Sequence, residues 1–395
     1  MNKITKIIYF IESPFNQRDY ERFGIEIFIL YGFEVHVWDF TPFLHPQVDS
    51  SVIPPDPIEY KNFMRFDSKR DAVAAISKEW KDCFVVSLIS YHIGTFSIFR
   101  QISKNKIPYS IFISNSIPSP YKNKSKKYLF EKIRRLTPRK LINHLLIKIL
   151  IFIFGVSSAT FALAGGAKSS IKMPLINNET EVVWIHTLDY DIYLDNKESV
   201  QDETKMAVFL DEYFPFHPDF IHSGTNTPVT PEEYYPLLCK FFDYVEEDLG
   251  LKVVIAAHPR SHYDKFPDFF QGRKVIQGKT IELVKDSKLV ILHCSTSMNF
   301  SVLYKKPMIF ITMDGLEKSI YGGYISKFAS YLRKTSINIS KNSGIDLERE
   351  FFVYKEGYAK YKHDFIKMEG TEEKPFWEVV AKKIKFLTIF KGTDN

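Results

Sequence analysis

Three short apolar runs within residues 252–312 constrain the fold of this chain more than any other feature. They are Lys252–Ala257, Leu289–Leu292 and residues 307–312. Each run consists mainly of valine, isoleucine and other apolar residues and ends at polar residues or a turn, which is typical of parallel strands covered on both faces. The segments between them, residues 268–287 and 297–306, are long enough for crossover helices. We therefore predict a βαβαβ unit, in which ligands bind at the carboxyl ends of the strands.

Polar residues follow two of these runs at the predicted carboxyl edge. His258 follows the first run, and Ser295, Thr296 and Ser297 follow the second. Hydroxyl groups and free backbone N–H groups at a helix start readily bind phosphate, so this pattern indicates a nucleotide phosphate site. Each feature alone also has an ordinary interpretation. The hydroxyl cluster would cap a helix that begins near Met298, and the histidine would be a polar strand end.

The composition is that of a globular protein with room for two domains. The chain has 395 residues, of which 45% are hydrophobic and 25% charged, which excludes a disordered chain. Its cysteines, Cys83, Cys239 and Cys294, are too far apart to suggest a disulfide framework or a zinc site. The first residues lead directly into a predicted strand without a signal-peptide cleavage site. We therefore expect a cytoplasmic protein.

The N-terminal part of the chain forms the first of two predicted α/β layers. Strand Lys6–Ile11, a helix over residues 20–31 and a strand over residues 34–40 make a first βαβ unit. Glu12 and Asn16 lie in the loop at the carboxyl end of its first strand. The chain contains neither Gly-x-Gly-x-x-Gly nor a P-loop, which argues against an enzyme that uses NAD or FAD.

A basic stretch leads into an apolar one within residues 122–154. Residues 122–148 contain ten lysine and arginine residues and one acid, Glu131. The apolar residues 141–154 are fewer than the ~20 that a membrane-spanning helix needs. This pattern favours a helix lying in an anionic membrane interface, or else a core helix preceded by solvated lysines. Nucleic-acid binding is disfavoured, because an Ile/Leu/Phe block follows the lysines instead of spaced aromatic residues.

The middle of the chain contains two further groups of acids. Asp189 and Asp191 follow a predicted strand over residues 182–185, where they could bind a sugar hydroxyl, act as a base or simply cap the next turn. A polar linker is predicted over residues 195–204. The second α/β layer then begins at Met206–Leu210 and places Asp211 and Glu212 at the end of that strand. Helices are predicted over Pro231–Leu249, residues 318–333 and Phe376–Phe390.

Two Rossmann-like layers joined by a linker resemble the glycosyltransferase-B architecture. The resemblance implies an α/β fold of two domains facing a cleft, with the C-terminal helix crossing back. The N-terminal acceptor domain would span residues 1–195, the nucleotide-sugar domain residues 205–375, and the returning helix residues 376–395. It also implies acceptor contacts at Glu12, Asn16, Asp189 and Asp191.

The strand-end motifs carry a more specific resemblance. His258-Pro259 followed by Ser295-Thr296 resembles the HP and Ser-Ser/Thr motifs of bacterial sialyltransferases and polysialyltransferases, which use CMP-activated nonulosonic acids. Their acidic motif ends in glycine, whereas the nearest match here is Asp211-Glu212-Tyr213. The resemblance implies that Asp211 or Glu212 is the general base and that His258 protonates or binds the phosphate. It places the nucleotide at His258, Pro259, Arg260, Ser295, Thr296 and Ser297.

These features predict metal-independent transfer of a sugar to a surface glycan such as lipopolysaccharide, O-antigen or capsule. The donor would be a nucleotide sugar, CMP-linked by preference, and the enzyme would bind peripherally to the inner membrane. No metal or resident cofactor is expected. Three alternatives remain open: a transferase for UDP- or GDP-sugars in which Glu282 or Glu317 binds the ribose, a sugar-nucleotide 2-epimerase, and a non-catalytic membrane-bound scaffold of polysaccharide assembly, in which the acids and His258 would be dispensable.

Overall fold

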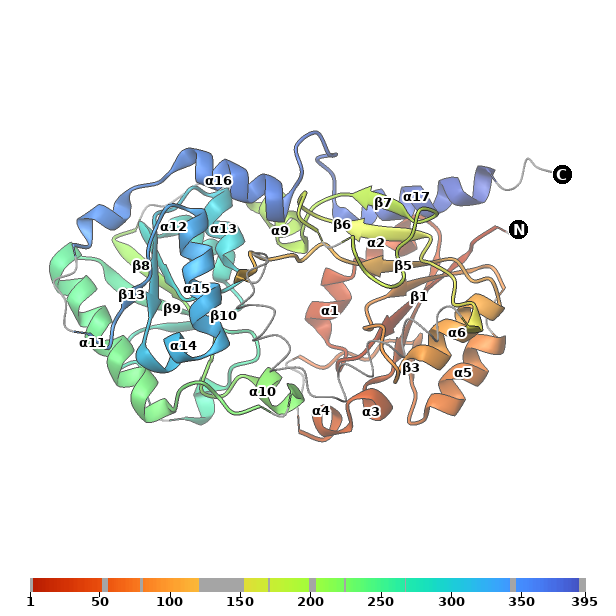
Figure 1. Cartoon of the computed structure of the whole chain (residues 1–395), viewed down its shortest axis with the longest axis horizontal. Coiled ribbons are helices and arrows are strands. Elements are labelled where there is room, and N and C mark those ends of the chain that lie inside the picture. Colours follow the sequence, from red (N-terminus) through yellow and green to blue (C-terminus); the bar gives the residue numbers. More distant parts are fainter. Residues whose placement is uncertain are drawn as a thin grey trace. The chain divides into compact units, whose positions relative to one another are not determined.

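The computed structural model describes residues 3–51, 56–78, 81–120, 153–169, 171–198, 204–223, 225–266, 268–341 and 346–390. It divides into two compact units, and Figure 1 labels many of their elements. Unit 1 comprises Met1–Ser116, Asn123–His186 and Gly370–Asn395, and unit 2 comprises Ile117–Lys122 and Thr187–Glu369. The division thus falls before the predicted linker at residues 195–204, and the chain rejoins unit 1 before the last helix begins.

Unit 1 is a seven-stranded parallel sheet in the order β3-β2-β1-β4-β5-β6-β7. Its strands are β1 Lys6–Ile11, β2 Glu34–Asp39, β3 Phe63–Arg65, β4 Cys83–Ser87, β5 Tyr109–Phe112, β6 Phe161–Ala164 and β7 Glu181–Trp184. Every residue of β4 and β6 is buried, and so is β1 after its first residue. The predicted first βαβ unit is confirmed, since β1 and β2 pair in parallel.

The helix predicted over residues 20–31 is wrong in one respect, because the structure breaks it at Gly24. The helices of unit 1 are α1 Gln17–Arg22, α2 Ile25–Leu30, α3 Thr41–Leu44, α4 Pro46–Ser51, α5 Lys69–Lys78, α6 Phe96–Lys104 and α17 Phe376–Phe390. Gly24 has a left-handed φ of 61°, and a Cβ atom there would lie 2.4 Å from the Trp377 ring. The Trp377 indole donates to the Arg22 carbonyl at 2.7 Å and packs against Tyr9. The break therefore makes room for the last helix, which belongs to unit 1.

Unit 2 is a six-stranded parallel sheet in the order β10-β9-β8-β11-β12-β13. Its strands are β8 Met206–Leu210, β9 Lys252–Ala257, β10 Val275–Gln277, β11 Leu289–Leu292, β12 Met308–Thr312 and β13 Ile337–Asn338. The three apolar runs are therefore confirmed as strands β9, β11 and β12. Strand β10 lies inside the predicted crossover at residues 268–287. It is a three-residue edge strand without a fully buried residue, so it leaves no apolar run in the sequence.

The helices of unit 2 include Pro231–Leu249, which is confirmed with the bounds that the sequence predicted. They are α9 Leu188–Asn196, α10 Pro218–Ser223, α11 Pro231–Leu249, α12 Thr280–Asp286, α13 Met298–Leu303, α14 Asp314–Lys318, α15 Ile320–Tyr331 and α16 Lys355–Tyr361. The helix predicted over residues 318–333 is confirmed as α15, and the short helix α14 precedes it. Ser319 separates them, because its hydroxyl accepts the Tyr321 N–H at 3.1 Å and caps the start of α15.

The two sheets share one topology. In each, the first strand lies centrally, the second and third strands extend the sheet on one side, and the fourth begins the other side. The predicted class, α/β with two Rossmann-like parallel sheets, is confirmed. In such sheets ligands bind beyond the carboxyl ends of the strands at the point where the strand order reverses. These points lie between β1 and β4 in unit 1 and between β8 and β11 in unit 2.

Most of the predicted membrane-binding stretch, residues 122–154, lies outside the described residues. Of its last residues, Phe154 is 42% exposed and packs against Phe96 and the guanidinium of Arg100. Among the residues that the structure describes, no helix is long and apolar enough to span a membrane.

Candidate functional site

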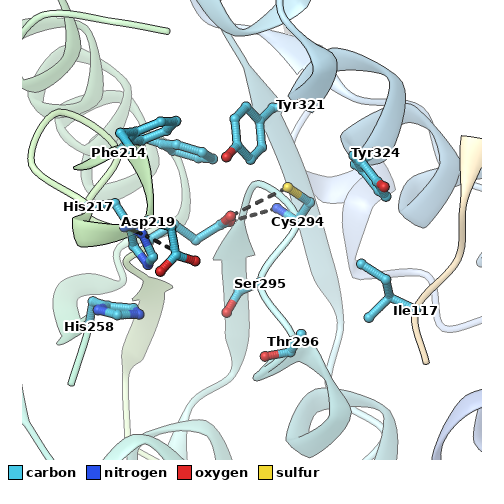
Figure 2. A pocket seen from close by; sticks show the side chains of 12 residues that line it. Ile117, Phe214, His217, Asp219, His258, Cys294, Ser295, Thr296, Tyr321 and Tyr324 are labelled. Carbon is cyan, nitrogen blue, oxygen red and sulfur yellow. Dashed lines mark hydrogen bonds and ion pairs between the residues drawn. The ribbon is translucent and has the colours of Figure 1, made fainter. Parts of the chain in front are cut away.

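A pocket of about 350 Å³ lies in unit 2, and side chains from the loops after β8, β9 and β11 reach into it (Figure 2). Helix α15 contributes its first turns. The lining residues are Ile117, Glu212, Phe214, His217, Asp219, Phe220, His258, Cys294, Ser295, Thr296, Tyr321 and Tyr324. The pocket therefore occupies the carboxyl edge at the point where the strand order of unit 2 reverses, as the sequence predicted for a ligand site.

Glu212 is the carboxylate that the fold holds across this reversal point. Its Oε1 accepts the main-chain N–H of Cys294 at 2.6 Å, and its Oε2 lies 3.4 Å from the Cys294 thiol. Burial raises the pKa of Glu212 to about 7, against the effect of these hydrogen bonds. A pocket carboxyl that changes protonation near neutrality is suited to accept or donate a proton during a reaction.

Asp211 is buried and is not among the residues that line the pocket. It is only 4% exposed. The carboxylate accepts three hydrogen bonds, from the Tyr213 N–H at 2.9 Å, the Tyr263 hydroxyl at 2.9 Å and the His258 N–H at 3.3 Å. Burial raises the pKa of Asp211 to about 6. Of the two acids predicted as alternatives for the base, the structure thus places Glu212 in the pocket. Asp211 instead joins the ends of β8 and β9.

Tyr213 follows the two acids at the end of β8 and has an unusual backbone conformation. Its φ is 52°, in the left-handed region that glycine adopts without cost and that strains a bulky residue. The ring packs edge-on against Tyr263 at a centroid distance of 5.2 Å. A glycine would therefore adopt the backbone conformation of residue 213 without strain.

Two histidines stand side by side in the pocket. The ring centroids of His217 and His258 are 4.7 Å apart. Each ring accepts at Nδ1 a main-chain N–H from two residues further on, Asp219 for His217 and Arg260 for His258, both at 3.2 Å. A neutral ring whose Nδ1 accepts must carry its proton on Nε2. Both rings can therefore act as Nε2–H donors, which suits a bound phosphate.

The sequence analysis did not predict His217 as a site residue, although the sequence contains a pattern that indicates it. His217-Pro218 repeats the dipeptide His258-Pro259 and also follows a strand of the same sheet. The predicted ligand residue Arg260 instead forms an ion pair with Asp219 at 3.0 Å, and Asp219 Oδ2 lies 3.7 Å from His217 Nδ1.

The predicted hydroxyl cluster is divided by the structure. Ser295 and Thr296 line the pocket opposite the histidines in Figure 2. The Ser295 hydroxyl accepts the Ser297 N–H at 3.2 Å, and α13 begins at Met298, as predicted. Ser297 and Pro259 are not among the lining residues.

The predicted acceptor residues lie elsewhere. Asn16 caps α1 by accepting the Asp19 N–H at 3.0 Å. Asp189 accepts the Asn299 amide at 2.9 Å, and Asp189 and Asp191 both occupy the first turn of α9, where acids stabilise a helix. Glu12 belongs to unit 1 and is described below.

The residues proposed for the alternative donors also lie outside the pocket lining. Glu282 and Glu317 are exposed, on α12 and α14. Within the described ranges, no group of three or more His, Cys, Asp or Glu side chains is arranged to hold a metal ion.

Behind the pocket, the loop after β11 rests on a buried histidine. His293 is fully buried, and burial lowers its pKa to about 4, so the ring is neutral. Its Nδ1 donates to the Ile311 carbonyl at 2.7 Å, and its Nε2 accepts the Tyr234 hydroxyl at 3.1 Å. These bonds fix the residue that precedes Cys294 and therefore help to fix the partner of Glu212.

Comparison with known proteins supports the architecture. No protein-family model matches the chain, and no curated protein matches it. Among solved structures, a His-to-Asn variant of the wall teichoic acid polymerase TagF with CDPG has a TM-score of 0.56 at 13% identity, over 99% of this chain and 90% of that chain. The calicheamicin glycosyltransferase CalG4 has a TM-score of 0.55 at 9% identity, over 100% of both chains. At these identities the likeness concerns the fold, and it confirms the predicted glycosyltransferase-B class.

Proposed function

We propose that this chain is a glycosyltransferase that binds a nucleotide-activated sugar in the pocket of unit 2 and transfers the sugar to a hydroxyl group of a surface glycan. The observation that carries the proposal is the convergence on one pocket of the Glu212 carboxylate with the imidazoles and hydroxyls of His217, His258, Ser295 and Thr296. The fold of the chain, shared with CalG4, supports the same reaction class.

The chemistry requires a base and a stabiliser for the leaving phosphate. Glu212 in its ionised form takes the proton of the acceptor hydroxyl, whose oxygen then bonds to the anomeric carbon. The bond from that carbon to the nucleotide phosphate breaks, and the phosphate leaves with its electron pair. His217 and His258, as Nε2–H donors, and the hydroxyls of Ser295 and Thr296 stabilise the charge that develops there.

The charges of the pocket support a CMP-linked donor. Among the described residues, its lining includes the acids Glu212 and Asp219 and no lysine or arginine, although Arg260 outside the lining pairs with Asp219. The phosphate of a CMP-sugar carries one negative charge, whereas the diphosphate of a UDP- or GDP-sugar carries two, which this lining opposes more strongly. The strand-end motifs and the left-handed backbone at Tyr213 also fit the sialyltransferase resemblance. We therefore favour a CMP-activated nonulosonic acid as the donor.

Two observations support the acceptor class. TagF, which shares the fold, is a wall teichoic acid polymerase. In this chain, the basic and apolar residues 122–154 would bring the enzyme to the cytoplasmic face of the inner membrane. A lipid-linked or lipopolysaccharide acceptor fits that location.

A thermal-shift panel of CMP, UDP, GDP and their sugars tests the proposal. A nucleotide at a hundredfold excess over its Kd stabilises its site by about 2.7 kcal/mol, which corresponds to a rise in Tm of about 5–10 °C for a domain of this size. We expect that rise with CMP and its sugars, and its loss in His258→Ala. A rise in Tm with UDP or GDP alone would show that the donor is a UDP- or GDP-sugar. No rise in Tm with any nucleotide would favour the non-catalytic scaffold.

A further inference from the structure

Unit 1 repeats the carboxylate arrangement of the unit 2 pocket. In unit 2, Glu212 accepts both the main-chain N–H and the side-chain donor of Cys294. In unit 1, Glu12 Oε1 accepts the main-chain N–H of Ser90 at 3.0 Å and its hydroxyl at 2.9 Å. In both units one glutamate therefore receives two donors from a single residue.

The two pairs also occupy corresponding places in the topology. Glu12 follows β1 and Glu212 follows β8, the first strand of each unit. Ser90 follows β4 and Cys294 follows β11, the fourth strand of each unit. Both pairs thus bridge the point where the strand order reverses, which is the general ligand position of open α/β sheets. The correspondence covers topology and hydrogen bonding together.

Histidines complete the cluster in unit 1. His45 caps the end of α3, the short helix after β2, and its Nε2 lies 3.4 Å from Glu12 Oε2. His92 Nδ1 accepts the main-chain N–H of Gly94 at 2.9 Å. His217 and His258 also accept at Nδ1 the N–H of the residue two positions further on. Glu12 and His45 are 21% and 31% exposed at their side chains, so a ligand can reach them while their partners hold them in place.

The chemistry of this cluster selects hydroxyl groups over phosphate. A carboxylate accepts hydroxyl protons and repels anions, and imidazole nitrogens both donate to and accept from hydroxyls. Burial lowers the pKa of His92, although the Glu12 carboxylate opposes that shift, so this ring is neutral at pH 7. A neutral, polyhydroxylated ligand therefore fits better than a phosphorylated one.

We infer that Glu12, His45 and Ser90 form a second ligand site, on unit 1, which takes the hydroxyl groups of a neutral sugar. The existence of this site stands on the geometry above. Its identification as the acceptor site rests on the proposed function.

Saturation-transfer NMR on the full chain tests the inference with defined probes. The neutral probes are the methyl β-glycosides of galactose, glucose and N-acetylglucosamine, the anionic probe is glycerol 3-phosphate, and CMP reports on unit 2. The variants are Glu12→Gln, whose amide oxygen can still accept the Ser90 N–H, and His45→Asn. Glu34→Gln is the matched control, because it breaks another Glu–His pair of unit 1, Glu34 with His36 at 2.8 Å, at the opposite end of β2.

We expect at least one methyl glycoside to bind, with about tenfold weaker binding in Glu12→Gln or His45→Asn and no change in Glu34→Gln. The CMP signal should be unchanged in all three variants. Equal glycoside binding in every variant would overturn the site, as would binding of glycerol 3-phosphate in preference to the glycosides. No binding of any glycoside would also overturn it. Absence of CMP binding with normal glycoside binding would instead count against the proposed function and leave this site standing.

Discussion

The Glu212 carboxylate accepts the main-chain N–H of Cys294 at 2.6 Å, across the point where the strand order of unit 2 reverses. This bond ties the pocket carboxylate to the residue that precedes Ser295 and Thr296. The proposed base and the proposed phosphate-binding hydroxyls therefore belong to one rigid connection between β8 and β11. A substitution at Glu212 is therefore expected to change proton transfer directly and the positions of the Ser295 and Thr296 hydroxyls indirectly.

Replacing Glu212 with glutamine should abolish the proton transfer while keeping the shape of the side chain. The amide oxygen can still accept the Cys294 N–H, so nucleotide binding should persist while turnover falls by about 10²-fold or more. In the wild type the base must be ionised, and its pKa is about 7. kcat/KM should therefore fall about tenfold per pH unit below 7, and this limb should vanish in Glu212→Gln.

Protein stability provides an independent readout of the same substitution. The pKa of Glu212 is raised in the folded state from 4.5 to about 7, so the folded state binds the proton more tightly than the unfolded state. Its contribution to stability is therefore fully present below pH 4.5 and is lost as the pH rises through 7. Glu212→Gln should lack this loss, so its unfolding free energy relative to the wild type should rise between pH 4.5 and 8. Parallel pH profiles for the two proteins would contradict the raised pKa.

Asp211→Asn should destabilise the fold, although the change is nearly isosteric. In the structure, the buried carboxylate accepts from Tyr213, Tyr263 and His258. An amide nitrogen cannot accept, so at least one donor is left unsatisfied, at a cost of about 1–3 kcal/mol. Urea unfolding measures this cost. Full stability combined with lost turnover would return the role of base to Asp211.

The sequence predicted the sheets better than it predicted the site. Continuous apolar runs mark β9, β11 and β12 because these strands are buried on both faces. The edge strand β10 carries no such pattern. The break at Gly24 depends on Trp377, which is distant in sequence, so no local pattern reveals it.

For the site, strand ends were sufficient to find Glu212, His258, Ser295 and Thr296. Sequence position could not show whether Asp211 or Glu212 faces the pocket. Neighbouring residues of an extended chain point to opposite sides, and the sequence does not reveal which side is which. His217 lies beyond the strand end, and its place beside His258 follows from the course of the loop before α10. The repeated His-Pro dipeptide was the available signal.

The two pocket histidines should both be needed for turnover. His258→Ala is expected to lower turnover by about 10²-fold or more, and His217→Ala by about tenfold or more, because each removes a donor to the leaving phosphate. His262→Ala is a suitable control, since this neighbouring histidine does not line the pocket. Steady-state kinetics with a saturating donor separate loss of turnover from loss of binding. Wild-type turnover in His258→Ala would remove its proposed role.

The left-handed backbone at Tyr213 predicts an unusual order of stabilities. Tyr213→Ala and Tyr213→Gly both remove the ring and its contact with Tyr263. Only alanine keeps the strain of a Cβ atom at a φ of 52°, which amounts to about 1–2 kcal/mol. Glycine should therefore be the more stable of the two variants in urea unfolding, although it is usually the less stable residue. The reverse order would show that the backbone relaxes once the ring is gone.

The basic and apolar stretch predicts salt-sensitive membrane binding. Ten lysine and arginine residues between positions 122 and 148 face a single acid in the sequence, and the apolar residues 141–154 follow. Each basic residue near anionic lipid contributes about 1 kcal/mol, and apolar burial adds a term that salt does not screen. Binding should therefore weaken but persist as salt rises.

Liposome co-sedimentation with and without anionic lipid, at low and high salt, measures this binding. Changing Lys122, Lys124, Lys126 and Lys127 to glutamine removes about 4 kcal/mol of attraction at low salt, a loss of roughly two to three powers of ten in affinity. The matched control changes four exposed lysines of unit 2 to glutamine: Lys252, Lys274, Lys279 and Lys288. If the two quadruple variants bind alike, the attraction reflects net charge and not this stretch. If the wild type stays in the supernatant throughout, the stretch belongs to a core or an interface, and the acceptor need not be lipid-linked.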